Sequence, residues 1–321
     1  MLGCILALAT SASADVLRDH DNGPLTGIFG IPDSTEGGRL LRAGESAWEL
    51  SITHASHSVF EARPSEALYL DGETSRFEFR YRKAIGNKLE LGVELPYMQH
   101  QPGKLDSFID SFHNIFGMPE GNRPDRGHDL LDFRYADLTG LHVYEKDSSA
   151  GIGDTRLFGG WKLLTSDRHQ MALRFGVKLP TGDSARLHGS GGTDVSVGVA
   201  GDVNRLFGTD RLTGFYRMHA IHLGEPDVLA NRYQDWAAYV STGIGFQAGQ
   251  RIELLLQGAV RTAVYDSVIH SLGGNSTTVT FGTNIDLSNK YQLSVAITED
   301  ADVASAPDVA FQIALRYRGA K

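Results

Sequence analysis

The feature that most constrains the fold of this chain is a strict two-residue alternation of apolar and polar side chains. Between residues 169 and 179 the large apolar residues all share one parity: Met171, Leu173, Phe175, Val177 and Leu179. A period of two is that of a β-strand with one apolar and one polar face. Strands of soluble proteins are usually about 5–6 residues long, whereas a tilted strand that crosses a bilayer needs roughly 9–11. Segments of the longer class recur from residue 47 to residue 317, and they predict a transmembrane β-barrel.

About twelve such segments can be drawn, an even number as in bacterial single-chain barrels. They are 47–58, 74–85, 88–98, 152–164, 169–179, 194–204, 211–223, 235–248, 251–264, 277–287, 291–298 and 308–318. Short connections such as Gly86-Asn87 alternate with long ones such as 59–73 and 99–151. Periplasmic turns and extracellular loops alternate in this way in an antiparallel up-and-down barrel whose termini are both periplasmic. A thirteenth strand at 138–144 would invert all later strands, so this segment is predicted to be an excursion within a loop.

Composition agrees with this class of protein. The 321 residues include 37 Gly and only 10 Pro, and 21% are charged. The chain lacks the roughly 20 consecutive apolar residues of a membrane helix. A barrel does not need them, because its outward apolar and inward polar residues alternate and average out in a hydropathy profile. The net charge of -9 argues against nucleic acid as a partner, because nucleic-acid binding needs a basic face.

The first residues predict export. Residues 1–14 hold an apolar core followed by Ala12-Ser13-Ala14, the pattern of a cleaved signal peptide, and they contain the only cysteine, Cys4. Residues 15–45 are polar, rich in glycine and without periodicity, and we interpret them as a periplasmic N-terminal lead-in. Residues 46–321 would form the barrel, which we expect in the bacterial outer membrane. Its expected partners are the lipid bilayer, the barrel-assembly machinery and periplasmic chaperones.

Aromatic residues fall where the two interfacial girdles of a barrel belong. Those near the predicted periplasmic ends of strands are Trp48, Tyr81, Trp161, Tyr291 and Tyr317. Those near the predicted extracellular ends are Tyr97, Trp236 and Tyr265.

The long extracellular loop 99–151 carries a predicted amphipathic helix over 105–116. Its apolar face is formed by Leu105, Phe108, Ile109, Phe112 and Phe116, at the spacing of helical turns. A face this apolar must be buried. It packs either against loop strands and the barrel rim or over the mouth, where it would act as a gate or plug.

Charged residues on the inward parity are the candidate lumen lining. They are Arg76, Glu78, Arg80, Arg82, Glu90, Glu94, Arg156, Lys162, Arg174, Lys178, Arg217, Glu253, Arg261 and Arg316. With about twelve strands, the interior is either a narrow aqueous path or a packed electrostatic network. Charges of both signs favour mutual pairing, and rings of charge can also set the ion preference of a pore.

Enzymatic motifs are weak. His54-Ala55-Ser56 places a histidine and a serine on one face, but that face is the lipid-facing or rim parity, and we find no neighbouring Asn, Asp or Glu to orient the histidine. The loop acids Asp125, Asp129 and Asp132 do not have the spacing of an EF-hand calcium site. We therefore interpret them as solvated loop charges. We therefore predict no catalytic residues, no metal site and no cofactor.

Three stretches carry a family resemblance. Residues 105–119, LDSFIDSFHNIFGMP, followed by Gly121-Asn122-Arg123, resemble the hallmark loop of the outer-membrane domain-of-unknown-function family 3187. Gly151-Ile152-Gly153-Asp154 and the segment 179–183, LPTGD, resemble it as well. These two motifs are also similar to those of the outer-membrane proteins of phenol meta-pathway gene clusters, a family thought to include channels for hydrophobic solutes. The resemblance implies an outer-membrane barrel and no particular substrate. The chain departs from outer-membrane barrels in one respect, since Arg-Gly-Ala-Lys follows the aromatic Tyr317.

The sequence therefore predicts an outer-membrane β-barrel that acts as a passive channel or small-solute transporter with a charged lumen. Two alternatives stay open, namely an outer-membrane enzyme that modifies lipid and a closed structural or adhesion barrel that acts through its loops.

Overall fold

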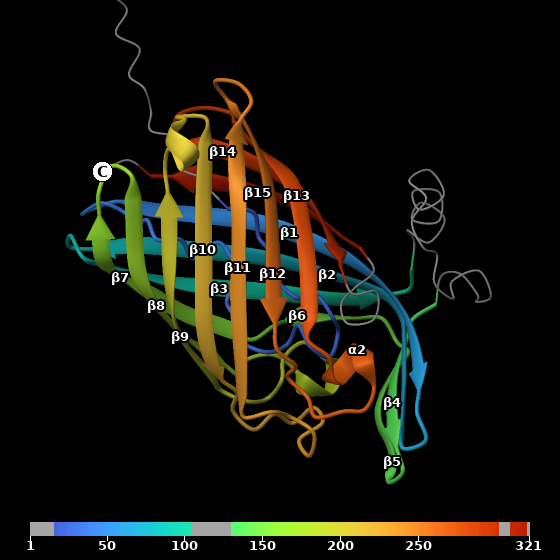
Figure 1. The fold of residues 1–321 in the computed structure, drawn as a ribbon. Coiled ribbons are helices and arrows are strands. Elements are labelled where there is room, and N and C mark those ends of the chain that lie inside the picture. The colour runs from blue at the N-terminus through green and yellow to red at the C-terminus, as the bar shows by residue number, and fades with distance from the viewer. Residues whose placement is uncertain (1–15, 104–129, 302–308, 320–321) are drawn as a thin grey trace, which may run out of the picture.

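The computed structural model describes residues 16–103, 130–301 and 309–319, and its main element is an antiparallel sheet (Figure 1). Within these residues the sheet has fifteen strands. They are β1 Ser46–Ala62, β2 Glu66–Ile85, β3 Leu89–Gln101, β4 Asp132–Asp137, β5 Gly140–Glu145, β6 Ser149–Ile152, β7 Thr155–Thr165, β8 His169–Leu179, β9 Asp194–Val203, β10 Leu212–His222, β11 Trp236–Gln247, β12 Ile252–Arg261, β13 Ser276–Asp286, β14 Tyr291–Asp300 and β15 Val309–Arg318.

Twelve of these strands close into a barrel. β1, β2, β3 and β7 to β15 pair in chain order, and β15 returns to pair with β1 from Ala47↔Arg318 to Ser56↔Val309. The twelve-strand antiparallel barrel predicted from the alternation is thus confirmed. Because β1 begins and β15 finishes at one end, we call that end the terminal end and the opposite one the loop end.

The first hairpin is longer than predicted. The sequence suggests a loop over 59–73, but β1 and β2 stay paired as far as Ala62↔Ala67. Two contacts favour the extra strand length: Phe60 packs edge-on against Tyr69, and residues 66–71 of β2 pair a second time, with β4. The rejected thirteenth strand lies largely in β5, which pairs with β4 outside the barrel wall. It is an excursion from the loop, as predicted.

Helical structure is sparse. The described helical segments are the single turn α2 (His270–Gly273) and the 3₁₀ turns η2 (Ser184–Arg186) and η3 (Leu206–Gly208). No helix in the described residues is long and apolar enough to span a membrane. The predicted helix 105–116, with its candidate gate residues Leu105, Phe108, Ile109, Phe112 and Phe116, lies outside the described residues, as does the predicted signal peptide 1–14.

The outer surface follows the predicted parity. Alternate wall residues expose large apolar side chains, for example Leu50, Leu91, Leu157, Leu256 and Ile313. At the terminal end Trp48 stacks on Tyr317, with ring centroids 5.6 Å apart, and Tyr291 packs against both. Tyr265 was predicted for the girdle at the opposite end, but it is fully buried, because the segment after β12 turns inward and packs Tyr265 against Phe29.

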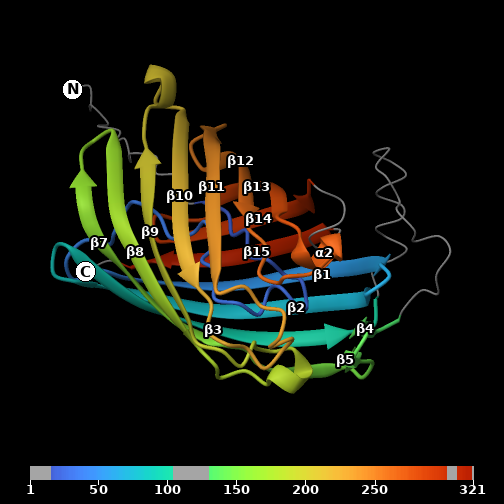
Figure 2. The ribbon, with the colours of Figure 1, turned by 60° about the horizontal axis from the view of Figure 1, so that its bottom comes forward.

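The segment before β1 lies inside the barrel. Residues 16–44, here called the plug, run as a dark blue trace within the ring of strands (Figure 2). Val16 accepts a hydrogen bond from Arg316 near the terminal end, Leu25 accepts one from Tyr265 near the loop end, and Leu41 returns to Glu90. The prediction of a periplasmic lead-in over 15–45 is therefore wrong in its placement. A segment without periodicity needs hydrogen-bond partners for its backbone, and here the polar inner wall supplies them.

Candidate functional site

The charged residues that the sequence predicts to line the lumen are mostly buried, and several of them contact residues 16–44. Nearly all are buried although their strand neighbours are exposed, and Arg82, Lys162 and Arg316 are partly exposed. A barrel interior of this width is filled by side chains or by an inserted segment. In this protein it is filled by both, because the inner-wall charges pair with one another and with the plug.

Arg18 of the plug is the centre of the first cluster. Its guanidinium lies 2.8 Å from Asp33 of the plug and 2.6 Å from Glu49 of β1, and it also contacts Glu78 of β2. Glu94 of β3 is 3.8 Å away. The Arg18 side chain is about 1% exposed. One cation from the plug thus neutralises acids of three neighbouring strands, and fixes the plug against that part of the wall.

The plug's own acids form the second cluster, with inner-wall arginines. Asp33 lies 3.5 Å from Arg80 of β2, and Glu36 lies 3.5 Å from Arg80 and contacts Arg156 of β7. All these side chains are buried, so each ion pair is shielded from water and each member depends on its partner.

Farther round the wall, strand side chains bind the plug backbone. Arg174 of β8 donates 2.8 Å to the carbonyl of Gly37, and it pairs with Glu90 of β3 at 2.5 Å. Arg217 of β10 donates 3.0 Å to the carbonyl of Ser34. Asp202 of β9 accepts from the Arg39 amide at 2.8 Å. Backbone groups that would otherwise be buried without partners are therefore satisfied by the wall.

Nearer the loop end, Lys178 and Asp194 of the wall also bind the plug backbone. Lys178 of β8 lies between Asp154, 2.7 Å away, and Asp194, 3.1 Å away, and it donates to the carbonyl of Ile28. Asp194 accepts from the Gly30 amide at 2.7 Å. Glu253, by contrast, is set apart from these clusters, where it accepts from Thr213 of β10.

Sequence reasoning missed the plug and its residues Arg18, Asp33 and Glu36. One signal for it was present. The predicted lumen residues comprise ten basic and four acidic side chains. Such an excess cannot be buried by mutual pairing alone. The plug acids Asp21, Asp33 and Glu36 and the wall acids Glu49, Asp154, Asp194 and Asp202 supply counter-charges to these basic residues.

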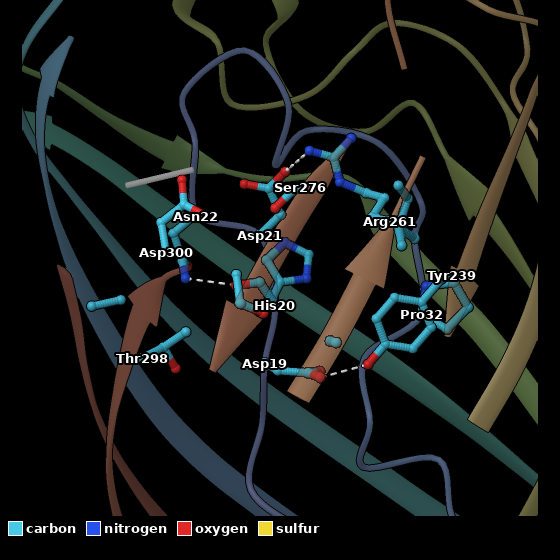
Figure 3. A pocket seen from close by; sticks show the side chains of 14 residues that line it. Asp19, His20, Asp21, Asn22, Pro32, Tyr239, Arg261, Ser276, Thr298 and Asp300 are labelled. Atoms are coloured by element: carbon cyan, nitrogen blue, oxygen red, sulfur yellow. Dashed lines mark hydrogen bonds and ion pairs between the residues drawn. The ribbon is translucent and has the colours of Figure 1, made fainter. Parts of the chain in front are cut away.

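A small cavity remains between the plug and the wall formed by β11 to β15. Its volume is about 40 Å³. Figure 3 shows Asp19, His20 and Asp21 of the plug facing Tyr239, Arg261, Ser276, Thr298 and Asp300 of the wall. Asp19 accepts from the Tyr239 hydroxyl at 2.6 Å, and Asp21 pairs with Arg261 at 2.8 Å. The wall therefore supplies a hydrogen-bond donor to Asp19 and a cation to Asp21.

The loop end is closed by an apolar cluster. The tip of the plug supplies Leu25, Ile28, Phe29 and Ile31. The inward-folded loops and the strands below them supply the remainder, including Leu187, Leu223, Leu229, Tyr265 and Leu272. The plug tip and the loops therefore share one core, and neither can move without exposing the other.

The structure corrects the interpretation of His54. Its Nδ1 lies 2.7 Å from Ser75 Oγ and its Nε2 lies 3.1 Å from Glu73 Oε2, both on β2. A carboxylate partner does therefore lie near this histidine, contrary to the sequence argument. Sequence separation concealed it, because the contact crosses between paired strands. Ser75 and Glu73 are both buried.

Among the described residues, no group of three or more His, Cys, Asp or Glu side chains has the arrangement of a metal site.

Comparisons with known proteins agree with this architecture. The family described as "Protein of unknown function (DUF3187)" matches residues 4–318. No curated protein matches the chain. Among solved structures, the COG4313 outer membrane channel from Pseudomonas putida F1 aligns over 88% of this chain and 98% of its own, with 14% identity and a TM-score of 0.57. The KdgM porin in complex with disordered oligogalacturonate aligns over 85% of this chain and 99% of its own, with 8% identity and a TM-score of 0.44.

Proposed function

The chain belongs to the DUF3187 family, and we propose that it is an outer-membrane channel for small solutes whose lumen is closed, in the state described here, by the plug. The terminal end then faces the periplasm and the loop end faces the cell exterior. The expected partners are the outer-membrane lipid bilayer, and the barrel-assembly machinery and periplasmic chaperones during biogenesis.

The observation that carries this proposal is the composition of the interior. A barrel that served only as a scaffold could fill its lumen with apolar side chains from its own wall. Here charged and polar groups extend from Arg316 at one end to Lys178 near the other, and a separate segment fills the space between them. Such an interior can be hydrated once the segment moves, because its groups exchange protein partners for water. The fold similarity to the COG4313 outer membrane channel supports the same function.

The test is conductance of the purified full-length protein in planar bilayers. We expect rare openings of the wild type, because opening must break the buried Arg18 and Glu36 pairs. Raising the salt concentration weakens ion pairs as they become hydrated, and should therefore raise the opening frequency. A protein that stays silent at all voltages and salt concentrations, and passes no solute in liposomes, would favour the closed structural barrel.

A second candidate function, hydrolysis of a lipid ester, is favoured by one observation. Ser75, His54 and Glu73 supply a nucleophile, a base and a carboxylate on the outward parity of the wall: Ser75 is hydrogen-bonded to His54, and His54 Nε2 lies 3.1 Å from Glu73 Oε2. Incubating the protein with phospholipid vesicles tests it, with Ser75→Ala and His54→Gln as the decisive variants. Release of fatty acid that both variants abolish would support hydrolysis, and intact lipid after prolonged incubation would exclude it.

A further inference from the structure

The two sides of the lumen hold the plug in different ways. Toward β1 to β3 and β7 to β10 the plug is bound by buried ion pairs and by arginine contacts to its backbone. Toward β13 and β14 it presents instead the apolar side chain of Leu17, which packs with Leu255 of β12 and Ala296 of β14. A methyl carbon of Leu17 also lies over Gly282 of β13, at 2.8 Å from where a Cβ would stand. The plug is thus anchored by a network of ion pairs on one side. On the other it is held by the packing of Leu17, by the single ion pair of Asp21 with Arg261 and by neutral hydrogen bonds such as that of Tyr239 to Asp19.

The inner wall around Leu17 is mostly uncharged. Thr280 and Thr298 are hydrogen-bonded to each other at 2.8 Å, and Ser294 donates to Asn284 at 2.6 Å. Gln312 donates to Thr53 on β1. Hydroxyl and amide groups therefore predominate around Leu17, although Glu253, Arg261 and Arg316 also belong to this part of the wall.

One further feature marks this side as the one open to a solute. The cavity of Figure 3 lies here, on the loop-end side of Leu17, and its lining includes the hydroxyl residues Tyr239, Ser276, Thr278 and Thr298 beside the acids Asp19, Asp21 and Asp300 and the paired Arg261. At ~10–15 Å³ per water it can hold about three waters.

We propose that solutes pass between plug residues 16–22 and the wall formed by β11 to β15, that Leu17 is the constriction of this path, and that the path takes small uncharged solutes bearing hydroxyl groups. The inference rests on the proposed channel function and adds its route and its substrate class. The hydroxyl-lined cavity offers hydrogen bonds to such a solute. The apolar contact of Leu17 with Leu255 and Ala296 excludes ions, because a charge would have to shed its hydration there.

The first experiment measures solute entry into liposomes that contain the full-length protein. Glycerol and glycerate serve as probes of similar size, one neutral and one anionic. We expect glycerol to enter faster than glycerate, and Leu17→Ala to raise glycerol entry on the order of tenfold, since it removes most of the apolar barrier. Leu25→Ala is the matched control, because Leu25 is an equally buried leucine of the plug that lies in the loop-end cluster. Heat-modifiable gel migration verifies that each variant forms the barrel.

The second experiment identifies which side of the lumen opens. Thr280 of β13 and Ser196 of β9 are inner-wall hydroxyl residues that are equally buried, at 1% and 2% exposure. Each is replaced by cysteine in a chain in which Cys4 is serine, and each is treated with neutral methyl methanethiosulfonate during glycerol flux. Faster modification of Thr280→Cys supports the proposed route, and block of the flux by that modification supports it further.

The outcomes separate the two proposals. Glycerol flux that is unaffected by Leu17→Ala, or faster modification of Ser196→Cys, would overturn this route and leave the channel function standing. Equal entry of glycerol and glycerate would overturn the substrate class. No entry of either probe, in the wild type or in Leu17→Ala, would overturn the channel function itself.

Discussion

Arg18 of the plug and Glu49 of β1 form a buried ion pair of 2.6 Å between the start of the described chain and the first barrel strand. The residues are 31 positions apart in sequence, and the intervening segment enters the lumen and returns. Glu49 is also contacted by Arg316 of β15, so this carboxylate joins the plug to both strands that close the barrel. The same acidic residue therefore binds the plug and bridges the two strands that close the barrel.

Replacing Arg18 with alanine should destabilise the plugged state by about 3–5 kcal/mol, because it leaves buried acids without their cation. Added protease should then cleave within 16–44, and planar-bilayer openings should become frequent. Arg63→Ala is the control, since Arg63 pairs with Glu61 at 2.6 Å but is half exposed. Its effect should stay within ~1 kcal/mol. Equal behaviour of the two variants would refute the anchoring role of Arg18.

Replacing Gly38 with valine should prevent the plug from seating. A Cβ at this position would lie 2.3 Å from the carbonyl oxygen of Gln170 and 2.8 Å from the Cα of Gly201, and wall backbone cannot yield as a side chain can. Gly249→Val is the matched control, because a Cβ there meets nothing within 4 Å. We expect raised conductance for Gly38→Val alone, with both variants still migrating as folded barrels. A silent Gly38→Val barrel would show that this contact does not hold the lumen closed.

Replacing Glu66 with alanine should release the β4–β5 hairpin and the loop before α2. Glu66 accepts from Tyr135 of β4 at 3.1 Å, pairs with Arg232 at 3.2 Å, and contacts Ser267. Loss of this buried carboxylate leaves partners on three separate segments unsatisfied, at a cost of roughly 1–3 kcal/mol. Limited proteolysis should then cut between 132 and 145, and unchanged resistance would contradict the assignment.

Acid should loosen the loop between β8 and β9. Burial lowers the pKa of His188, whose ring stacks on His100 and whose Nε2 lies 3.1 Å from Ser149 Oγ. Because the pKa of His188 is lower in the folded chain than in the unfolded chain, the folded loop binds fewer protons as the pH falls. Its stability is therefore complete above about pH 6.5 and is lost as the pH falls below that value.

Amide hydrogen exchange of residues 180–193 measures this effect. Exchange should quicken between pH 7 and pH 5 after correction for the intrinsic rate, and the change should be smaller in His188→Gln. An identical pH response in that variant would place the titrating group elsewhere.

The sequence by itself determined the barrel wall. A period of two, segments of about ten residues and the alternation of turns and loops are local properties of the sequence. Each of them predicts β-strands without knowledge of any distant residue. This is why the twelve strands, the outward face of Leu50 and Leu157, and the inward face of Arg174 and Arg217 could all be predicted.

Only the tertiary structure decided what fills the lumen inside the wall. Residues 16–44 carry no periodicity, and their backbone is held by side chains 135 to 183 positions away, such as Arg174 and Arg217. The Glu73–His54 contact and the inward turn of Tyr265 depend likewise on neighbours from other strands and loops. Ion pairing and burial act through space, whereas alternation acts along the chain. The sequence therefore predicted charged residues on the inward parity, and the packed structure showed that several of them bind residues 16–44 of the same chain.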